Sequence, residues 1–187
     1  MRQIVLASQS PRRQELLRRE GIDFIVDASF IDEVLDESLP LLKRLEKLAV
    51  DKGMDVAQRH LDDVIISADT TVYHNGTIIG KAQDIDEARE ILMSLSDTDH
   101  SVFTSVAIID HEDVMTFVEE TKVYFKKMDD YIDDYLDSRE WVGKAGAYGI
   151  QDDNCFFVDH IDGDFDNVVG LPVTRLKTIL KQSHFID

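Results

Sequence analysis

The sequence predicts an α/β fold in which a mixed β-sheet is flanked by helices. Short apolar segments typical of strands alternate along the chain with amphipathic segments typical of helices. In the middle of the chain, two long strand-like segments, 102–109 and 114–125, flank the polar turn 110–113 and predict an antiparallel pair. Such a pair within an otherwise alternating order indicates a mixed sheet rather than a purely parallel one.

The first third of the chain is expected to hold three strands and two helices. Pro11 and Pro40 stand where helices commonly begin, because proline lacks the N–H that a first helical turn leaves unpaired. Gly21 is expected to stop the first helix. The expected strands are 4–7, 24–26 and 64–68, and the expected helices are 11–20 and about 40–60.

The rest of the chain begins with a predicted hairpin over 71–79, because Asn75-Gly76 favours a tight turn between antiparallel strands. Asp84 is expected to cap the next helix, with Glu87 three residues on as a capping box. The buried face of that helix is expected to be Ile85, Ala88, Ile91, Leu92 and Leu95. Further along, we expect a helix at 129–136, a glycine-rich loop at 143–149, a strand at 156–158 and a last helix opened by Pro172.

Length and composition limit the class of protein. The chain has 187 residues, enough for one domain or a two-lobed unit with a sizeable core. No apolar run approaches the ~20 residues of a membrane-spanning helix, and the N-terminal residues lack the pattern of a signal peptide. The single cysteine, Cys155, excludes an intrachain disulfide and is expected to be an inert buried thiol. We therefore expect a cytoplasmic protein with no membrane partner.

The formal net charge of −18 argues against nucleic acid and anionic membranes as partners. It also repels a free nucleoside triphosphate at long range. Any phosphate chemistry must therefore come from a local basic cluster, from a divalent cation, or from both.

One such basic cluster is expected at the start of the first helix. Ser10 is a natural N-cap, and Arg12 and Arg13 then fall in the first helical turn. That end of a helix is unfavourable for cations, because the helix dipole is positive there. The two arginines are either solvated on an exposed turn or gathered around a bound anion.

Two charged residues are notable for their place in the pattern. Asp69 is expected to end the strand 64–68 and to open a turn, where it either takes part in chemistry or caps local N–H groups. Lys52 falls on the apolar stripe of its helix, three residues after Ala49 and four after Leu48. A lysine in that place either snorkels to the surface or points into a polar cleft.

Three further polar residues have a functional and an ordinary interpretation. Lys81 follows Gly80 at the exit of the hairpin and offers a point charge for a phosphate. Gln151 ends the glycine-rich stretch, where backbone can approach a ligand closely, and its amide either reads a base edge or lies in a plain turn. Glu33 lies in an acidic segment that is otherwise an ordinary surface loop.

A family resemblance favours the functional interpretations. The segment 8–17 resembles the N-terminal signature of the Maf family of nucleotide pyrophosphatases, and later segments match in the same order. These segments are 68–70, 80–81, 100–104, 145–151 and 167–172. The resemblance spans almost the whole chain and implies a single Maf-like domain over 1–187. It also implies a two-lobed α/β fold with a central cleft, similar to the inosine-triphosphatase architecture.

The resemblance also implies an activity and a set of site residues. The family hydrolyses nucleoside triphosphates to the monophosphate and pyrophosphate, with a divalent metal cation, Mg or Mn, as cofactor. Asp69 would be the general base, and Glu33 and Asp69 would hold the metal. The implied substrate-binding residues are Ser8, Arg12, Arg13, Lys52, Thr70, Lys81 and Gln151.

Within the family, the combination of Arg12, Thr70 and Gln151 resembles the subgroup that acts on dTTP and UTP. A second hypothesis for the function is a nucleotide-binding regulator of cell division, in particular of septum formation, with little turnover. A homodimer would fit the resemblance. The chain departs from the family pattern at four positions: Ala82 in place of proline, and Asp97, Ser105 and Asp152 in place of glycine.

Overall fold

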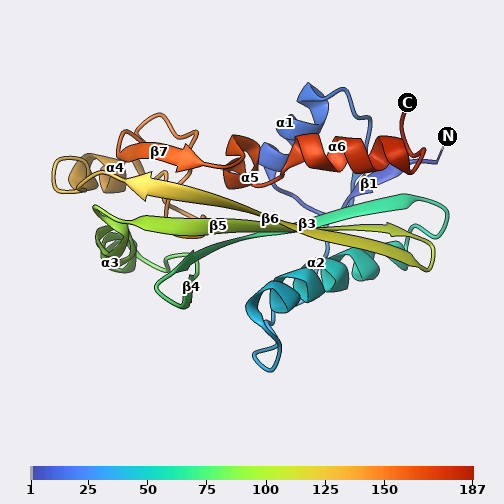
Figure 1. Cartoon of the computed structure of the whole chain (residues 1–187), viewed down its shortest axis with the longest axis horizontal. Coiled ribbons are helices and arrows are strands. Elements are labelled where there is room, and N and C mark those ends of the chain that lie inside the picture. Colours follow the sequence, from blue (N-terminus) through green and yellow to red (C-terminus); the bar gives the residue numbers. More distant parts are fainter. Residues whose placement is uncertain (1) are drawn as a thin grey trace. The chain divides into compact units, whose positions relative to one another are not determined.

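The computed structural model describes residues 2–187 and confirms the mixed α/β fold. Within those residues, seven strands form one sheet in the order β2-β1-β3-β5-β6-β7, with β4 paired to β3, and six helices accompany them (Figure 1). The strands are β1 (Ile4–Leu6), β2 (Ile25–Val26), β3 (Val64–His74), β4 (Thr77–Ile79), β5 (Asp99–Asp110), β6 (Asp113–Phe125) and β7 (Val158–Asp162). The helices are α1 (Pro11–Arg19), α2 (Leu41–Ala57), α3 (Ile85–Leu95), α4 (Ile132–Ser138), α5 (Phe165–Val169) and α6 (Val173–Gln182).

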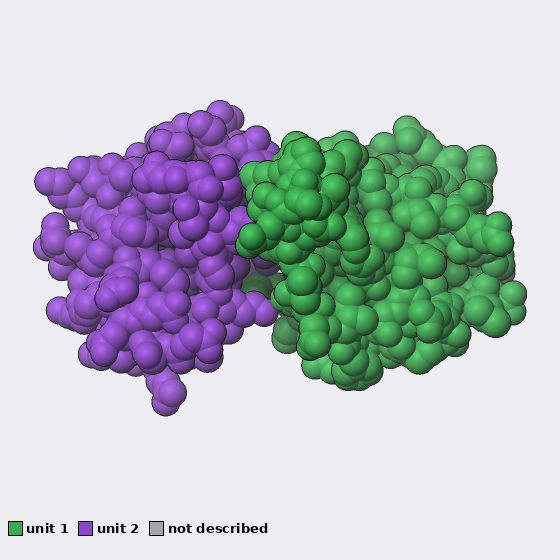
Figure 2. Space-filling view, turned by 90° about the horizontal axis from the view of Figure 1, so that it is seen from below, with its two compact units in different colours: residues 1–69, 104–119, 170–187 green, residues 70–103, 120–169 purple. Residues whose placement is uncertain are grey.

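The chain divides into two compact units, in agreement with the two lobes expected (Figure 2). Unit 1 consists of residues 1–69, 104–119 and 170–187, and unit 2 consists of residues 70–103 and 120–169. The division falls within three strands, because β3, β5 and β6 each contribute residues to both units.

Unit 1 is a sheet with helices on both faces. Strand β1 pairs in parallel with β2 on one side and with β3 on the other. Figure 1 shows α1 and α6 over one face of this part of the sheet and α2 over the other. On the α2 side, Val56 packs against sheet residues that include Val5, Ile65 and Ile109, all buried. This packing fixes α2 against β3.

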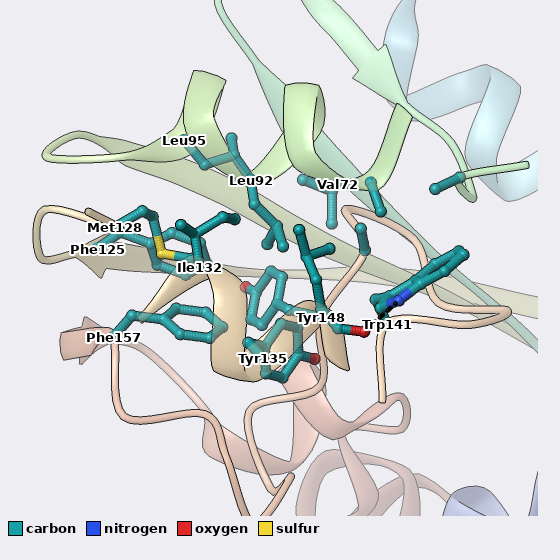
Figure 3. Packing of buried hydrophobic residues seen from close by; sticks show 14 of the residues in the cluster. Val72, Leu92, Leu95, Phe125, Met128, Ile132, Tyr135, Trp141, Tyr148 and Phe157 are labelled. Carbon is teal, nitrogen blue, oxygen red and sulfur yellow. Dashed lines mark hydrogen bonds between the residues drawn. The ribbon is translucent and has the colours of Figure 1, made fainter. Parts of the chain in front are cut away.

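Unit 2 is built around an aromatic core (Figure 3). Helix α3 contributes Leu92 and Leu95, and α4 contributes the fully buried Tyr135. The rings of Phe125 and Tyr135 each pack edge-on against Phe157, with centroids 4.9 Å apart. This core supports the irregular segment between α4 and β7, which includes the glycine-rich loop.

Several local predictions are confirmed by backbone geometry. Asn75 and Gly76 both have positive φ, as the tight hairpin turn requires. Asp84 caps α3 by accepting a hydrogen bond from the Glu87 N–H at 2.9 Å. The Glu87 carboxylate accepts from the N–H of Gln83 at 2.7 Å, so the box closes one residue earlier than expected. Asp97 has a φ of 59°, a left-handed conformation that glycine adopts without steric cost.

Other boundaries differ from the prediction. The segments 64–68 and 71–73 form one continuous strand, β3, and the short strand expected at 156–158 lies instead at 158–162. Strand β7 was hard to place because it is an edge strand with mostly polar, exposed residues. Ile85 is 45% exposed rather than buried, because it is the first residue of α3 and precedes the buried stripe. No helix in the described part of the chain is long and apolar enough to cross a membrane.

Candidate active site

The N-terminus of α1 holds Arg13 in a fixed position. Ser10 caps the helix as predicted, and its hydroxyl accepts from the Arg13 N–H at 3.5 Å. The Arg13 side chain turns back over this end, where Nη1 donates to Ser8 Oγ at 3.1 Å. Its Nε donates to the carbonyl of Gly170 at 2.8 Å. The predicted pair Ser8 and Arg13 is therefore in direct contact.

Three other charged groups of unit 1 act on the guanidinium of Arg13. Burial lowers the pKa of the Arg13 guanidinium, and the neighbouring Arg12 acts in the same direction, whereas Asp69 and Glu33 raise it. An arginine remains protonated in proteins, so the side chain is a buried permanent cation. These opposing effects place Arg13 within electrostatic range of Arg12 and of the two acidic residues predicted for the site.

A close approach of α2 to β3 brings Lys52 to Asp69. The helix lies so near the strand at Gly53 that a Cβ there would meet Ile109 Cδ1 at 2.6 Å and Ser67 Oγ at 2.7 Å. Ser67 also donates a hydrogen bond to the carbonyl of Ala49 at 2.6 Å. Lys52 precedes Gly53, and its side chain therefore starts beside the sheet.

Lys52 makes ion pairs with both predicted acidic residues. Its Nζ lies 2.6 Å from Asp69 Oδ1 and 2.8 Å from Glu33 Oε1. The Lys52 side chain is only 11% exposed, so it does not snorkel to the surface. Glu33 reaches it from a loop and is 52% exposed. The structure thus brings Glu33, Lys52 and Asp69 together as one cluster.

The expected place of Asp69 in a turn is wrong. Asp69 lies in the middle of β3, which continues to His74, and its side chain is 14% exposed. The hairpin pairing of residues 72–74 with β4 is as predicted, but Asp69 and Thr70 join that hairpin strand to the segment 64–68 without a turn. The buried Ser105 on β5 donates from its hydroxyl to the Asp69 carbonyl at 3.5 Å. A carboxylate on a strand interior is held more firmly than one on a turn.

The other three predicted residues belong to unit 2. Thr70 follows Asp69 on β3 and is half-buried. Lys81 is exposed, and its backbone forms an isolated bridge with Ala145 of the glycine-rich loop. Gln151 is exposed in a turn at the end of that loop. The structure therefore brings Lys81 to the same loop that leads to Gln151.

Two of the three glycines of this loop are needed for packing within the chain. A Cβ on Gly146 would meet the side chain of Val72 at 2.8 Å, and Gly146 has a φ of 69°. A Cβ on Gly149 would meet the Asp152 carboxylate at 2.6 Å. Both α-carbons thus face protein atoms rather than open space for a ligand.

Comparison with known proteins identifies the family of this chain. A family model described as Maf-like protein matches residues 3–183. The chain belongs to the Maf family. Curated Maf relatives named dTTP/UTP pyrophosphatase come from Bacillus cereus strain ZK / E33L, Bacillus anthracis and Bacillus thuringiensis subsp. konkukian. Each is 42% identical over 183 residues, which is 97% of this chain and 96% of the relative.

Solved structures that resemble this Maf chain are more distant. One is a nucleoside-triphosphatase, dITP/XTP pyrophosphatase, from Mycobacterium abscessus, with a TM-score of 0.45 and 16% identity. It covers 66% of this chain and 74% of that one. Another is a HAM1 protein from Coxiella burnetii, with a TM-score of 0.46, 19% identity and coverage of 67% and 73%.

The carboxylates of the Maf site have the right chemistry for a hard divalent cation. Glu33 and Asp69 both contact the ammonium of Lys52, so a positive charge already lies between two carboxylate groups. Residues 2–187 contain no group of three or more His, Cys, Asp or Glu side chains arranged to hold a metal. Mg²⁺ commonly takes one or two carboxylates together with substrate phosphates, so this pair fits such an ion.

Two residues that position the Maf site were not singled out from the sequence. Gly53 sets the approach of α2 to β3, and Gly170 supplies the carbonyl that holds Arg13. A signal for Gly53 existed, because a glycine inside a helix costs roughly 0.5–1 kcal/mol relative to alanine and so calls for a packing reason. The role of the Gly170 carbonyl depends on a contact between residues 157 positions apart.

Proposed function

We propose that this Maf protein hydrolyses dTTP and UTP to the nucleoside monophosphate and pyrophosphate. The observation that carries this function is the contact of Lys52 with Glu33 and Asp69, which puts the predicted base and its charged neighbours in one cluster. The names of relatives that are 42% identical over nearly the whole chain support the substrate class.

The cations of the site would bind the phosphates. Arg13 presents a guanidinium held on two sides at the N-terminus of α1, where the helix dipole also favours an anion. Ser8 adds a hydroxyl, and Lys52 and Lys81 add point charges. Because the rest of the chain is strongly acidic, these groups are the local attraction that a triphosphate requires.

Asp69 would act as the general base. Water would attack the α-phosphorus, its proton would go to the Asp69 carboxylate, and pyrophosphate would leave. Positioned proton transfer of this kind contributes about 10²–10⁴ in rate. Lys52 orients the carboxylate before substrate binds and stabilises negative charge that develops on the phosphate oxygens.

Glu33 and Asp69 would hold a divalent cation, Mg²⁺ or Mn²⁺. The cation would supply neutralisation of phosphate charge, which the net charge of −18 makes necessary. Lys52 now contacts both carboxylates. A cation held by these carboxylates would take the place of the Lys52 ammonium, which would then be available to the phosphates.

Base recognition would fall to Arg12, Thr70 and Gln151. The primary amide of glutamine carries a donor and an acceptor, which match the N3 and O4 edge of thymine and uracil. The exposed position of Gln151 leaves its amide accessible to a base.

The decisive experiment measures pyrophosphate release from a panel of nucleoside triphosphates in the presence of Mg²⁺ or Mn²⁺. Wild type is compared with Asp69→Asn and with Asp62→Asn, which changes an exposed aspartate outside the cluster. We expect turnover of dTTP and UTP that falls by about 10²–10⁴ in Asp69→Asn alone. Nucleotide binding without turnover in wild type would overturn the enzymatic function and favour the nucleotide-binding regulator.

A further inference from the structure

Gln151 lies at the tip of a β-turn that is unusually well anchored. The turn runs from Gly149 to Asp152, and the Asp152 N–H donates to the Gly149 carbonyl at 3.0 Å. Gln151 is exposed at the turn, whereas the side chain of the next residue, Asp152, points inward and is 9% exposed. The turn therefore presents one side chain outward and uses its neighbour as an anchor.

Both ends of this turn are bound to one buried hydroxyl. The Gly149 N–H donates to Tyr135 Oη at 3.3 Å, and that hydroxyl donates to Asp152 Oδ2 at 2.8 Å. Tyr135 comes from α4 and is fully buried in the aromatic core of unit 2 (Figure 3). The core thus holds the first and last residues of the turn through a single rigid side chain.

Lys144 completes the anchor from the beginning of the glycine-rich loop. Its Nζ contacts both carboxylate oxygens of Asp152, and its side chain is 13% exposed. A Cβ on Gly149 would meet this Nζ at 2.8 Å, so the turn packs directly on the ion pair. The Gly146 N–H donates to the Gly80 carbonyl at 3.0 Å, which fixes the loop on its other side.

A buried ion pair of this kind adds little net stability, so a different benefit must explain it. Removing a lysine and an aspartate from water has a large desolvation penalty, and a well-packed apolar pair is often at least as stable. The retained benefit of a buried polar network is conformational specificity, which is a hypothesis to be tested for each protein. Here the part made specific is the turn that carries Gln151.

We propose that Tyr135, Lys144 and Asp152 are positioning residues that fix the Gly149–Asp152 turn and thereby set base discrimination by Gln151. This role rests on the proposed function, in which Gln151 contacts the base. A glutamine amide that can turn over pairs with the O4 of thymine or with the amino group of cytosine. Discrimination between the two therefore depends on where the turn places the amide relative to the base, and a fixed backbone limits the positions that the amide can reach.

The test compares three single variants. Tyr135→Phe removes only the central hydroxyl, Asp152→Asn removes the charge but keeps an acceptor, and Asp153→Asn changes the adjacent exposed aspartate as the matched control. We expect the ratio of kcat/KM for dTTP to that for dCTP to fall about tenfold in Tyr135→Phe, because the turn loses both hydrogen bonds of the hydroxyl. The same ratio should fall less in Asp152→Asn, and in Asp153→Asn it should equal that of wild type.

A second measurement does not depend on activity. In the nucleotide-free protein, the amide hydrogens of Gly149 and Asp152 should exchange at least about tenfold faster in Tyr135→Phe than in wild type, because local opening becomes easier. Amides in β1, in unit 1, should keep their wild-type exchange.

A double variant separates positioning from general stability. Lys144→Met with Asp152→Leu replaces the ion pair by apolar groups, which commonly preserves stability. We expect a midpoint of urea unfolding close to that of wild type together with a lowered dTTP to dCTP ratio. A double variant that is as stable as wild type and also has the wild-type dTTP to dCTP ratio would overturn the positioning role.

The outcomes distinguish this inference from the proposed function. Unchanged dTTP to dCTP ratios in all variants of an active enzyme would overturn the inference and leave the function intact, whatever the exchange rates. If wild type releases no pyrophosphate, the function fails. The ratio of dTTP to dCTP dissociation constants is then compared between wild type and Tyr135→Phe, and equal ratios overturn the inference.

Discussion

Lys52 Nζ lies 2.6 Å from Asp69 Oδ1, a contact that joins the fourth turn of α2 to the middle of β3. Both side chains are largely buried, and Glu33 contacts the same ammonium from a loop. The lysine thereby balances two carboxylates that would otherwise repel each other and any phosphate. In the proposed reaction this single cation first orients the base and then faces the substrate.

Replacing Lys52 with methionine should impair catalysis more than folding. The variant keeps most of the apolar stem but leaves Asp69 and Glu33 without their shared cation. We expect kcat/KM for dTTP to fall about 10²-fold or more, the usual effect of losing a group that stabilises transition-state charge. Steady-state pyrophosphate release measures this fall.

The matched control is Lys47→Met, which removes an exposed lysine of the same helix that pairs with Asp51. An exposed i,i+4 pair contributes only about 0.3–0.5 kcal/mol, so this variant should keep its activity. Equal losses of activity in the two variants would contradict a specific role for Lys52.

Gly53→Ala tests whether the approach of α2 to β3 sets the site. A Cβ there would meet Ile109 Cδ1 at 2.6 Å and Ser67 Oγ at 2.7 Å, so either the helix or these buried side chains must shift. We expect the free energy of unfolding to fall by about 1–3 kcal/mol, the usual cost of overpacking, despite the better helix propensity of alanine. Urea unfolding measures it.

Gly80→Ala is the comparison for Gly53→Ala in the same unfolding experiment, since no heavy atom lies within 4 Å of a Cβ at Gly80. Its free energy of unfolding should stay within about 0.5 kcal/mol of wild type. A Gly53→Ala protein as stable and as active as wild type would show that the close approach does not position Lys52.

Lys52 and Asp69 show how far sequence reasoning reaches. The 3.6-residue period placed Lys52 on the buried stripe of its helix, and the stripe is indeed where the structure has it. Asp69 was misplaced in a turn, because a polar residue after an apolar run is typical of a strand end. The hairpin that follows was predicted, but the local pattern did not show that its first strand and the segment 64–68 are one continuous strand through Asp69.

The anchor beneath Gln151 could not be predicted from the sequence. Tyr135 lies in α4, but Lys144 and Asp152 lie in irregular backbone, where no period of 2 or 3.6 relates one residue to another. Their contact follows from positive φ at Gly146 and Ala147, which turns the loop back toward α4. The order of motifs predicted the loop, and only the structure shows what holds it.

Cys155 should be almost unreactive in the folded protein. Burial raises the pKa of its thiol to about 12, and Asp152 acts in the same direction while Lys144 opposes it. The thiolate is the nucleophile, so alkylation by iodoacetamide at pH 8 should be about a thousandfold slower than in the protein unfolded in urea. Mass spectrometry of the labelled chain gives both rates. Comparable rates would contradict the predicted inert thiol.

His100 should make the protein sensitive to mild acid. It is 2% exposed in the core of unit 2, where its Nε2 lies 2.7 Å from Tyr148 Oη and its ring packs on Phe125. Burial lowers the pKa of His100 from 6.5 to about 4; His74 adds to this effect and Asp99 opposes it. Its Nδ1 has no hydrogen-bond partner among residues 2–187, so a second ring proton would be unsatisfied.

The direction of the pH effect follows from proton binding. Above pH 6.5 the imidazole is neutral in both folded and unfolded chains, and the stability is fully present. As the pH falls from 6.5 to about 4, the unfolded chain binds a proton that the folded chain excludes. The free energy of unfolding should therefore fall by about 3 kcal/mol across this window, and the loss is complete below it.

Urea unfolding of wild type, His100→Gln and His111→Gln at pH 7.5 and pH 4.5 checks this prediction. His100→Gln should be less stable than wild type at pH 7.5 but should lose about 2 kcal/mol less on acidification, since it has no buried imidazole to protonate. His111 lies in the exposed turn between β5 and β6, so its variant should lose as much as wild type. His100 is linked to the pH dependence only because the folded core excludes a proton from its ring. If His100→Gln loses as much free energy of unfolding on acidification as wild type, the acid sensitivity comes from other groups.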